Sequence, residues 1–168
     1  MNHRLLRRGI PGRHTAIHYA TFDTSTLQMR IVSAGMPGPL LLRGKDCQAL
    51  QIAGIPPDLF SEATYDEFLL QLEPGDSLLF CSDGLTDARH RQGQEFELDG
   101  LRDICRGHAS DSPIDLLNHI FSSIQDFSTA CRQWEDMTAA VFHLSGTLDL
   151  SLHLRRRWRK GHHSSHFI

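Results

Sequence analysis

Hydrophobic and polar positions alternate with a period of two in several short segments of the chain. Leu27, Met29 and Ile31 alternate with polar neighbours, and the segment 66–72 repeats this pattern. Such alternation is typical of a strand that buries one face. The segment 77–82 is mostly apolar, which indicates a strand buried on both faces. We therefore predict antiparallel strands near 15–22, 27–33, 66–72, 77–82 and 138–144.

Turn residues between the apolar segments predict hairpins. Asp23-Thr24-Ser25 lies between the first two predicted strands, and these residue types favour a short turn. Gly44-Lys45-Asp46 separates the apolar runs 40–42 and 47–52, which predicts another hairpin. Near the C-terminus, leucines at positions 148, 150, 152 and 154 alternate with other residues. This alternation predicts one extra strand over 145–154.

Apolar residues that recur with the period of a helix predict two helices. Residues 2–9 are expected to be the end of another helix. The segment 99–106 directs its apolar residues to one side, and the segment 113–126 begins with Ser112 as N-cap and Pro113 at the first helical position. The second helix should bury an apolar face made of Leu117, Ile120, Phe121 and Ile124. Hairpins followed by helices and further strands indicate an α+β fold, with helices packed on an antiparallel sheet.

Charge divides the chain into an acidic body and a basic tail. The net charge is -3, and residues 155–160 hold five of the 17 Lys and Arg residues. Without them, 12 basic residues face 20 acidic ones, a net charge of -8. An acidic body disfavours non-specific nucleic-acid binding and suits cations. We expect residues 155–168 to form a disordered tail; contact with anionic lipid or nucleic acid is the alternative.

Neither a membrane span nor a leader is indicated by the sequence. No apolar run approaches the ~20 residues of a membrane span. The basic segment 1–14 lacks the apolar stretch and cleavage site of a secretory signal. The four cysteines are far apart and form no Cys-x-x-Cys pair, which favours reduced, buried thiols at Cys47, Cys81, Cys105 and Cys131. We expect a cytoplasmic protein.

Acidic residues stand at two predicted strand boundaries. Asp83 follows the apolar strand, and Gly84 lets the chain turn sharply after it. Glu135 and Asp136 precede the strand 138–144, and only one of these neighbours can face a given site in extended chain. Either segment alone is typical of a solvated turn. Together they suit Mg²⁺ or Mn²⁺, which prefer carboxylate oxygen and water.

Other polar residues give weaker indications of chemistry. None of the 11 histidines forms His-x-x-x-His or another metal-ligand spacing within the predicted folded body. His162, His163 and His166 lie in the polar tail, so we interpret the histidines as exposed or packed side chains. Ser82 lacks the Gly-x-Ser-x-Gly surroundings of a nucleophile elbow, so we expect no catalytic residue beyond metal ligands.

Six segments follow one another in an order known from one protein family. They begin with Ala20-Thr21-Phe22-Asp23 and end with Gln133-Trp134-Glu135-Asp136-Met137-Thr138; between them lie 33–42, 54–60, 72–76 and 80–89. In this order and spacing the chain resembles the SpoIIE/RsbU-type branch of the PPM (type 2C) metal-dependent protein phosphatases. The resemblance covers about residues 1–144, as the C-terminal portion of such a domain.

The resemblance implies a fold, an activity and a metal centre. The fold is a sandwich of two antiparallel sheets flanked by helices. The activity is hydrolysis of phosphoserine or phosphothreonine, here on a small regulator protein of sigma-factor regulation. Two Mn²⁺ or Mg²⁺ ions bridged by an aspartate activate a water for in-line attack. By position, Asp83 matches the aspartate of the family's Asp-Gly motif, and Glu135 the first acid of its Asp-Asp-x-Thr motif.

Two departures from the family pattern change these expectations. The N-terminal segment with the bridging aspartate and a Gly-His-Gly stretch is absent, and Glu135 replaces an aspartate. Asp136 is the alternative ligand if the register shifts by one residue. We expect the carboxylate of Asp83 to lie about 4–7 Å from that of Glu135 or Asp136, with weak metal binding and turnover near background.

A non-catalytic pseudophosphatase that binds partners is the alternative function. Sheet edges left without neighbours should favour self-association.

Overall fold

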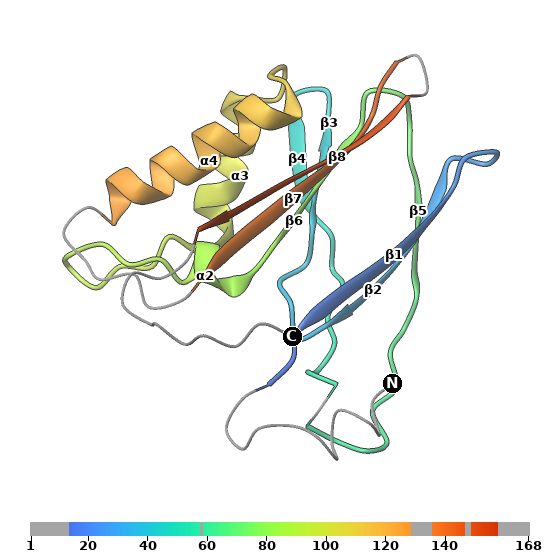
Figure 1. Cartoon of the computed structure of the whole chain (residues 1–168), viewed down its shortest axis with the longest axis horizontal. Helices are drawn as coiled ribbons and strands as arrows, with labels where there is room; N and C mark the ends of the chain where they lie inside the picture. The colour runs from blue at the N-terminus through green and yellow to red at the C-terminus, as the bar shows by residue number, and fades with distance from the viewer. Residues whose placement is uncertain (1–13, 58, 129–135, 147–148, 158–168) are drawn as a thin grey trace.

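Two antiparallel sheets and three helices make up the described part of the molecule (Figure 1). The structure, a computed structural model, describes residues 14–57, 59–128, 136–146 and 149–157. The predicted α+β architecture is therefore confirmed. The predicted helix end at 2–9 lies outside the described residues.

The smaller sheet contains three strands in the order β1-β2-β5. These are β1 (Ile17–Asp23), β2 (Gln28–Ala34) and β5 (Phe68–Gln71), and all pairings are antiparallel. The turn between β1 and β2 is held by Asp23, whose Oδ1 accepts hydrogen bonds from the backbone N–H of Ser25 at 2.8 Å and from its hydroxyl at 2.6 Å. The predicted hairpin is confirmed.

The larger sheet contains five strands in the order β4-β3-β6-β7-β8. Their bounds are Leu40–Arg43 (β3), Asp46–Ala49 (β4), Ser77–Cys81 (β6), Met137–Leu144 (β7) and Leu150–Arg157 (β8). β4 ends three residues before the predicted Ile52. The N–H of Leu50 still donates to Pro39 O at 2.9 Å, in register with the β3–β4 pairing, but proline has no N–H to return. The chain then turns, since the N–H of Ile52 donates to Leu50 O.

Three helices follow β6 in the sequence, namely α2 (Asp83–Thr86), α3 (Glu97–Gly107) and α4 (Pro113–Phe127). α4 begins as predicted, because the Ser112 hydroxyl accepts the backbone N–H of Asp115 and donates to its carboxylate at 2.6 Å. The predicted apolar face of α4 is buried: Leu117, Ile120, Phe121 and Ile124. None of the helices in the described ranges is long and apolar enough to cross a bilayer.

β8 extends three residues beyond the predicted strand, and the predicted boundary between strand and tail at 154/155 falls inside it. The arginines there contact α4. Arg155 donates to the side chain of Asn118 and lies over the Phe121 ring, 4.9 Å from its centroid. Arg157 donates to Gln125 Oε1 at 2.9 Å. These contacts between distant segments keep the start of the basic segment in the sheet.

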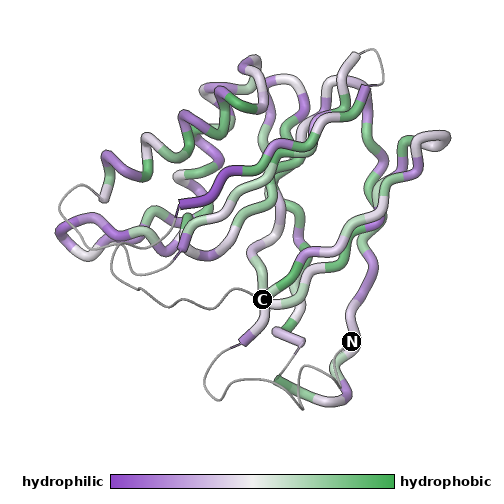
Figure 2. Tube along the Cα trace, viewed as in Figure 1, coloured by the Kyte–Doolittle hydropathy of each residue, from purple (hydrophilic) through white to green (hydrophobic). Residues whose placement is uncertain are grey.

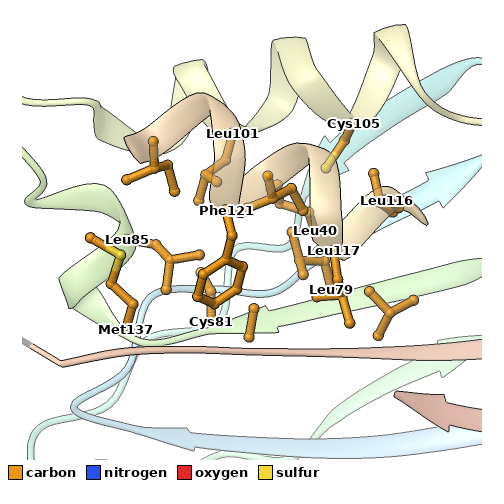
Figure 3. Close-up of a cluster of buried hydrophobic side chains, with 14 of the residues drawn as sticks. Leu40, Leu79, Cys81, Leu85, Leu101, Cys105, Leu116, Leu117, Phe121 and Met137 are labelled. Carbon is orange, nitrogen blue, oxygen red and sulfur yellow. The ribbon is translucent and has the colours of Figure 1, made fainter. Parts of the chain in front are cut away.

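β6 separates two hydrophobic cores. Leu79 points to one face of the sheet, into a core shared with α3 and α4; Figure 3 shows Leu117 and Phe121 reaching toward it from α4. Leu78 points to the opposite face, into a core between the two sheets that includes Ile31. In Figure 2, hydrophobic positions are frequent along the strands in the middle of the larger sheet, and hydrophilic and hydrophobic positions alternate along α4. The apolar run of 77–81 is therefore explained by burial on both faces.

A buried carboxylate closes one end of the larger sheet. Asp76, 2% exposed, lies in the turn before β6. Its Oδ1 accepts from Arg43 Nε at 2.9 Å, and its Oδ2 accepts from Arg43 Nη2 at 2.6 Å and from the N–H of Glu73 at 2.8 Å. These hydrogen bonds to Asp76 raise the pKa of the Arg43 guanidinium. The pair joins β3 to the turn that precedes β6.

Close glycine contacts pack the segment 33–39 against the segment 50–56. The N–H of Gly35 donates to Gly54 O at 2.6 Å. A Cβ at Gly54 would lie 2.1 Å from Ser33 O, and one at Gly38 would lie 2.2 Å from Leu50 O. Both positions therefore require glycine for the backbones to approach this closely.

Candidate functional site

The end of β6 and the start of β7 lie side by side. In this antiparallel pair Cys81 is opposite Ala139. One step beyond, the N–H of Ser82 donates to Thr138 O at 2.9 Å, and the N–H of Thr138 donates to Ser82 Oγ at 3.0 Å. Asp83 is the next residue after Ser82, and Asp136 lies two residues before Thr138. The fold therefore brings these two acids, far apart in sequence, to the same end of adjacent strands.

Asp83 occupies the first position of α2 and is exposed to solvent. Its Oδ1 accepts the N–H of Gly84 at 2.9 Å, while Gly84 itself is buried. The backbone carbonyl of Asp83 accepts from the hydroxyl of Thr86 and from the N–H of Asp87. The segment 83–86, expected only as a turn, thus forms one helical turn that fixes the aspartate at its N-terminus.

Ser82 connects the two acidic segments. Its hydroxyl donates to the backbone carbonyl of Asp136 at 3.4 Å while accepting the N–H of Thr138. Asp136 is also exposed. Sequence reasoning considered Ser82 only as a nucleophile and missed this positioning role, which depends on a strand 56 residues away.

Glu135 lies outside the described residues. Which of Glu135 and Asp136 faces Asp83, and whether the carboxylates lie about 4–7 Å apart, stay predictions.

The thiol next to this site is not available as a nucleophile. Cys81 is buried at the end of β6. Burial, and to a smaller extent the charge of Asp83, raises the pKa of the Cys81 thiol to about 12. The thiol therefore stays protonated at neutral pH, and the thiolate is the reactive form. The exposed carboxylates are the remaining candidates for chemistry at this strand end.

The donors at this strand end fit a hard cation that keeps much of its water. Both described acids are exposed and offer carboxylate oxygen, which suits Mg²⁺ or Mn²⁺. Within the described ranges, three side chains of metal-ligand type have their N and O ligand atoms within 4.8 Å of one another at a different place: His108, Asp111 and His119. The described part of the β6–β7 end thus supplies two acids rather than a complete ligand set.

A hollow of about 50 Å³ adjoins the acidic end of β7. It is lined by Asp136, Met137 and Thr138 together with Arg156 and Arg157 of β8. A guanidinium group suits phosphate recognition because it is planar and always charged. Sequence reasoning had placed these arginines in a disordered tail, so it missed their position beside Asp136.

The family model for stage II sporulation protein E (SpoIIE) matches residues 1–145. No curated protein matches the sequence. The solved structures with the same fold include the phosphatase domain of SpoIIE from Bacillus subtilis, from Mn-presoaked crystals, with a TM-score of 0.66 and 17% identity over 86% of this chain. The SiaA PP2C domain of Pseudomonas aeruginosa gives a TM-score of 0.73 and 18% identity over 83% of this chain.

A third solved structure contains the RsbU and RsbW domains of a Mycobacterium tuberculosis protein; it gives a TM-score of 0.66 and 19% identity over 95% of this chain. The chain spans 62%, 56% and 41% of these three solved chains, respectively. It therefore corresponds to part of each. The match to the family model extends over most of the sequence and agrees with the observed sheets and helices, so the chain belongs to the SpoIIE family of PP2C-type protein phosphatase domains.

Proposed function

We propose that this chain forms the β6–β7 part of a phosphoserine/phosphothreonine phosphatase centre that depends on Mn²⁺ or Mg²⁺. The observation that carries the proposal is the register of β6 and β7, which brings Asp83 and Asp136 to one strand end. Family membership supports the reaction class. The exposed carboxylates support a hydrated cation rather than a closed structural metal site.

In this proposal each residue at the strand end has a distinct role. Asp83 and either Glu135 or Asp136 would hold the metal. A bound metal of this type polarises phosphoryl oxygen and lowers the pKa of a coordinated water. Ser82 keeps the two acidic segments together through its two hydrogen bonds, and Gly84 supplies the N–H that orients the Asp83 carboxylate.

The arginines that line the adjoining hollow would attract the substrate phosphate. Their side of the site is thus suited to an anionic substrate, and the carboxylate side to a cation. We propose a phosphorylated regulator protein as the substrate. A solved relative combines RsbU and RsbW domains, which supports such a regulatory context.

Free cysteines at three buried positions support a cytoplasmic location.

A second function, binding of partners without catalysis, is favoured by the small number of acids. The described residues supply two carboxylates at the strand end, both exposed to solvent. Two such ligands leave most coordination positions of a cation to water, so affinity is low and a second ion is poorly held.

Mn²⁺ titration tests the metal site, and a turnover assay with Mn²⁺ separates the phosphatase from the non-catalytic partner-binding module. We expect calorimetry to detect weak Mn²⁺ binding that Asp83→Ala weakens by at least about tenfold, since even residues that only support a ligand contribute about that much. Turnover of a phosphoserine peptide with Mn²⁺ should stay near background. Asp103→Ala, which removes an exposed carboxylate on α3, is the matched control and should leave binding unchanged. Equal binding by Asp83→Ala would refute the site, and robust Mn²⁺-dependent turnover would refute the expected impairment.

We further propose that β8 mediates self-association of two copies. β8 is an edge strand of the larger sheet and carries three exposed leucines, of which Leu152 is 68% exposed. Antiparallel pairing of two β8 strands centred on Leu152 would place Leu150 of one copy opposite Leu154 of the other, and Asp149 opposite Arg155. Apolar and opposite-charge pairs across strands both stabilise such an arrangement.

Light scattering should therefore find dimers or larger species of the unmodified chain. Leu152→Lys should shift the population to monomer, because it places two like charges opposite each other at the centre of the pairing. Ile114→Lys changes an equally apolar residue, 54% exposed on α4, and should not change the mass. A monodisperse monomer of the unmodified chain would contradict self-association.

A further inference from the structure

Two histidines and one aspartate converge where α3 ends and α4 begins. The Nδ1 atom of His108 lies 2.8 Å from Asp111 Oδ2, and the Nε2 atom of His119 lies 3.4 Å from the same oxygen. The three ligand atoms all lie within 4.8 Å of one another. The imidazole rings are stacked, with centroids 3.8 Å apart and an angle of 14° between their planes.

Backbone hydrogen bonds and helix α4 set the positions of these three residues. His108 caps the C-terminus of α3, where its N–H donates to Ile104 O at 3.0 Å. The N–H of Asp111 donates to His108 O at 3.1 Å, which closes a turn between the helices. Asp111 directly precedes Ser112, the capped start of α4, and His119 lies on the following turns of that helix. The group therefore forms together with the α3–α4 connection.

These distances resemble the edges of a tetrahedral metal complex. With metal–nitrogen bonds of about 2.0–2.1 Å, neighbouring ligand atoms in a tetrahedron lie about 3.3–3.4 Å apart. The two measured separations from Asp111 Oδ2, 2.8 and 3.4 Å, enclose that value. The stacked imidazole rings must rotate out of their parallel arrangement so that both nitrogen lone pairs point at one ion, and the partial exposure of the side chains leaves space for that rotation. All three side chains are partly exposed, between 32% and 46%, which leaves room for a water as fourth ligand.

We propose that His108 Nδ1, Asp111 Oδ2 and His119 Nε2 bind one Zn²⁺ ion, with water as the fourth ligand. Imidazole nitrogen suits zinc and similar late transition metals, whereas carboxylate and water suit Mg²⁺ and Mn²⁺. The site is thus chemically distinct from the carboxylate end of β6 and β7. Bound zinc would fasten the end of α3 to α4, the two helices that cover one face of the larger sheet (Figure 1).

Zinc at this position would stabilise the folded chain by mass action, since the three ligands come together only in the folded state. It would not require the phosphatase centre. Asp83→Ala, which is expected to weaken Mn²⁺ binding, should leave zinc affinity unchanged. The two proposals can therefore fail independently.

The experiment must separate this site from the tail, which holds His162, His163 and His166. The reference protein is the full chain with those three residues changed to Gln. Zn²⁺ calorimetry on it should show one equivalent bound, and Co²⁺ should give the visible absorption of a tetrahedral site. Zn²⁺ should also raise the thermal midpoint of the reference protein, and this rise should shrink when His119→Gln is added.

Adding His119→Gln to the reference protein should weaken zinc binding by about 100-fold or more, because loss of even a supporting residue of a metal site costs about 10–100-fold. Asp111→Asn, which keeps the size of the side chain, should also weaken zinc binding. It tests the site independently if His119→Gln fails to fold. His153→Gln in β8 is the matched control and should bind like the reference. Equal zinc affinity in the reference protein and both site variants, or no binding by the reference protein, would overturn the proposal.

Discussion

Arg43→Ala is expected to lower the free energy of unfolding by about 3 kcal/mol, because it leaves the buried carboxylate of Asp76 without its charged partner. Asp76 is 2% exposed and would retain the N–H of Glu73 as a donor, but would lose both guanidinium hydrogen bonds. We choose the lower end of the range for broken buried pairs because 40% of the Arg43 side chain is exposed, so water can reach part of the gap. Denaturant unfolding measures the difference.

Arg30→Ala provides the matched control. Arg30 also pairs with an acid that directly precedes a strand, Glu67, but both side chains are more than 60% exposed. Such surface pairs contribute about 0–1 kcal/mol. If the two variants lost similar stability, burial of Asp76 would not be the cause. A small loss for Arg43→Ala alone would mean that water fully replaces the guanidinium.

Gly54→Ala is expected to destabilise the fold by about 3 kcal/mol, at the upper end of the range for overpacking. The added Cβ would lie 2.1 Å from Ser33 O, a backbone atom that cannot rotate away. The two segments would have to separate, which would also break the 2.6 Å hydrogen bond from Gly35 to Gly54. Thermal unfolding should show a lower midpoint.

Gly107→Ala tests whether this loss reflects the close approach rather than the loss of a glycine. A Cβ at Gly107, the last residue of α3, would have no heavy atom within 4 Å. Its helical position should tolerate alanine or gain up to about 1 kcal/mol. A loss at Gly54 no larger than the change at Gly107 would contradict the packing argument.

Local sequence patterns predicted those strands and helices in which buried and exposed residues follow a regular period. The alternation near Leu27 and the capped start at Ser112 both correspond to structure, because each signal and its cause lie within a few residues. The C-terminal end of β8 could not be predicted this way. Arg155 and Arg157 remain in the sheet through contacts with α4, more than 30 residues earlier, and no local pattern encodes those contacts.

The candidate site likewise has features that the local sequence predicted and features that depend on distant contacts. Asp83 was recognisable because an apolar strand ended beside it, and the predicted neighbourhood with Asp136 follows from strand pairing. The histidine group was missed because His108 ends α3 while His119 lies on α4, so the spacing in the sequence does not show that they meet. The packing of α4 against the end of α3 brings His108 and His119 together.

The double burial of β6 has a consequence for how the domain can evolve. Leu78 and Leu79 belong to different cores, so a change in either residue disturbs one core directly and the other through the shared backbone. Asp83, just beyond the strand, is exposed and belongs to neither core. If Asp83 holds a metal as proposed, a substitution there would change metal binding with little effect on packing. The scaffold can therefore gain or lose an acidic residue at the strand end while its architecture stays the same.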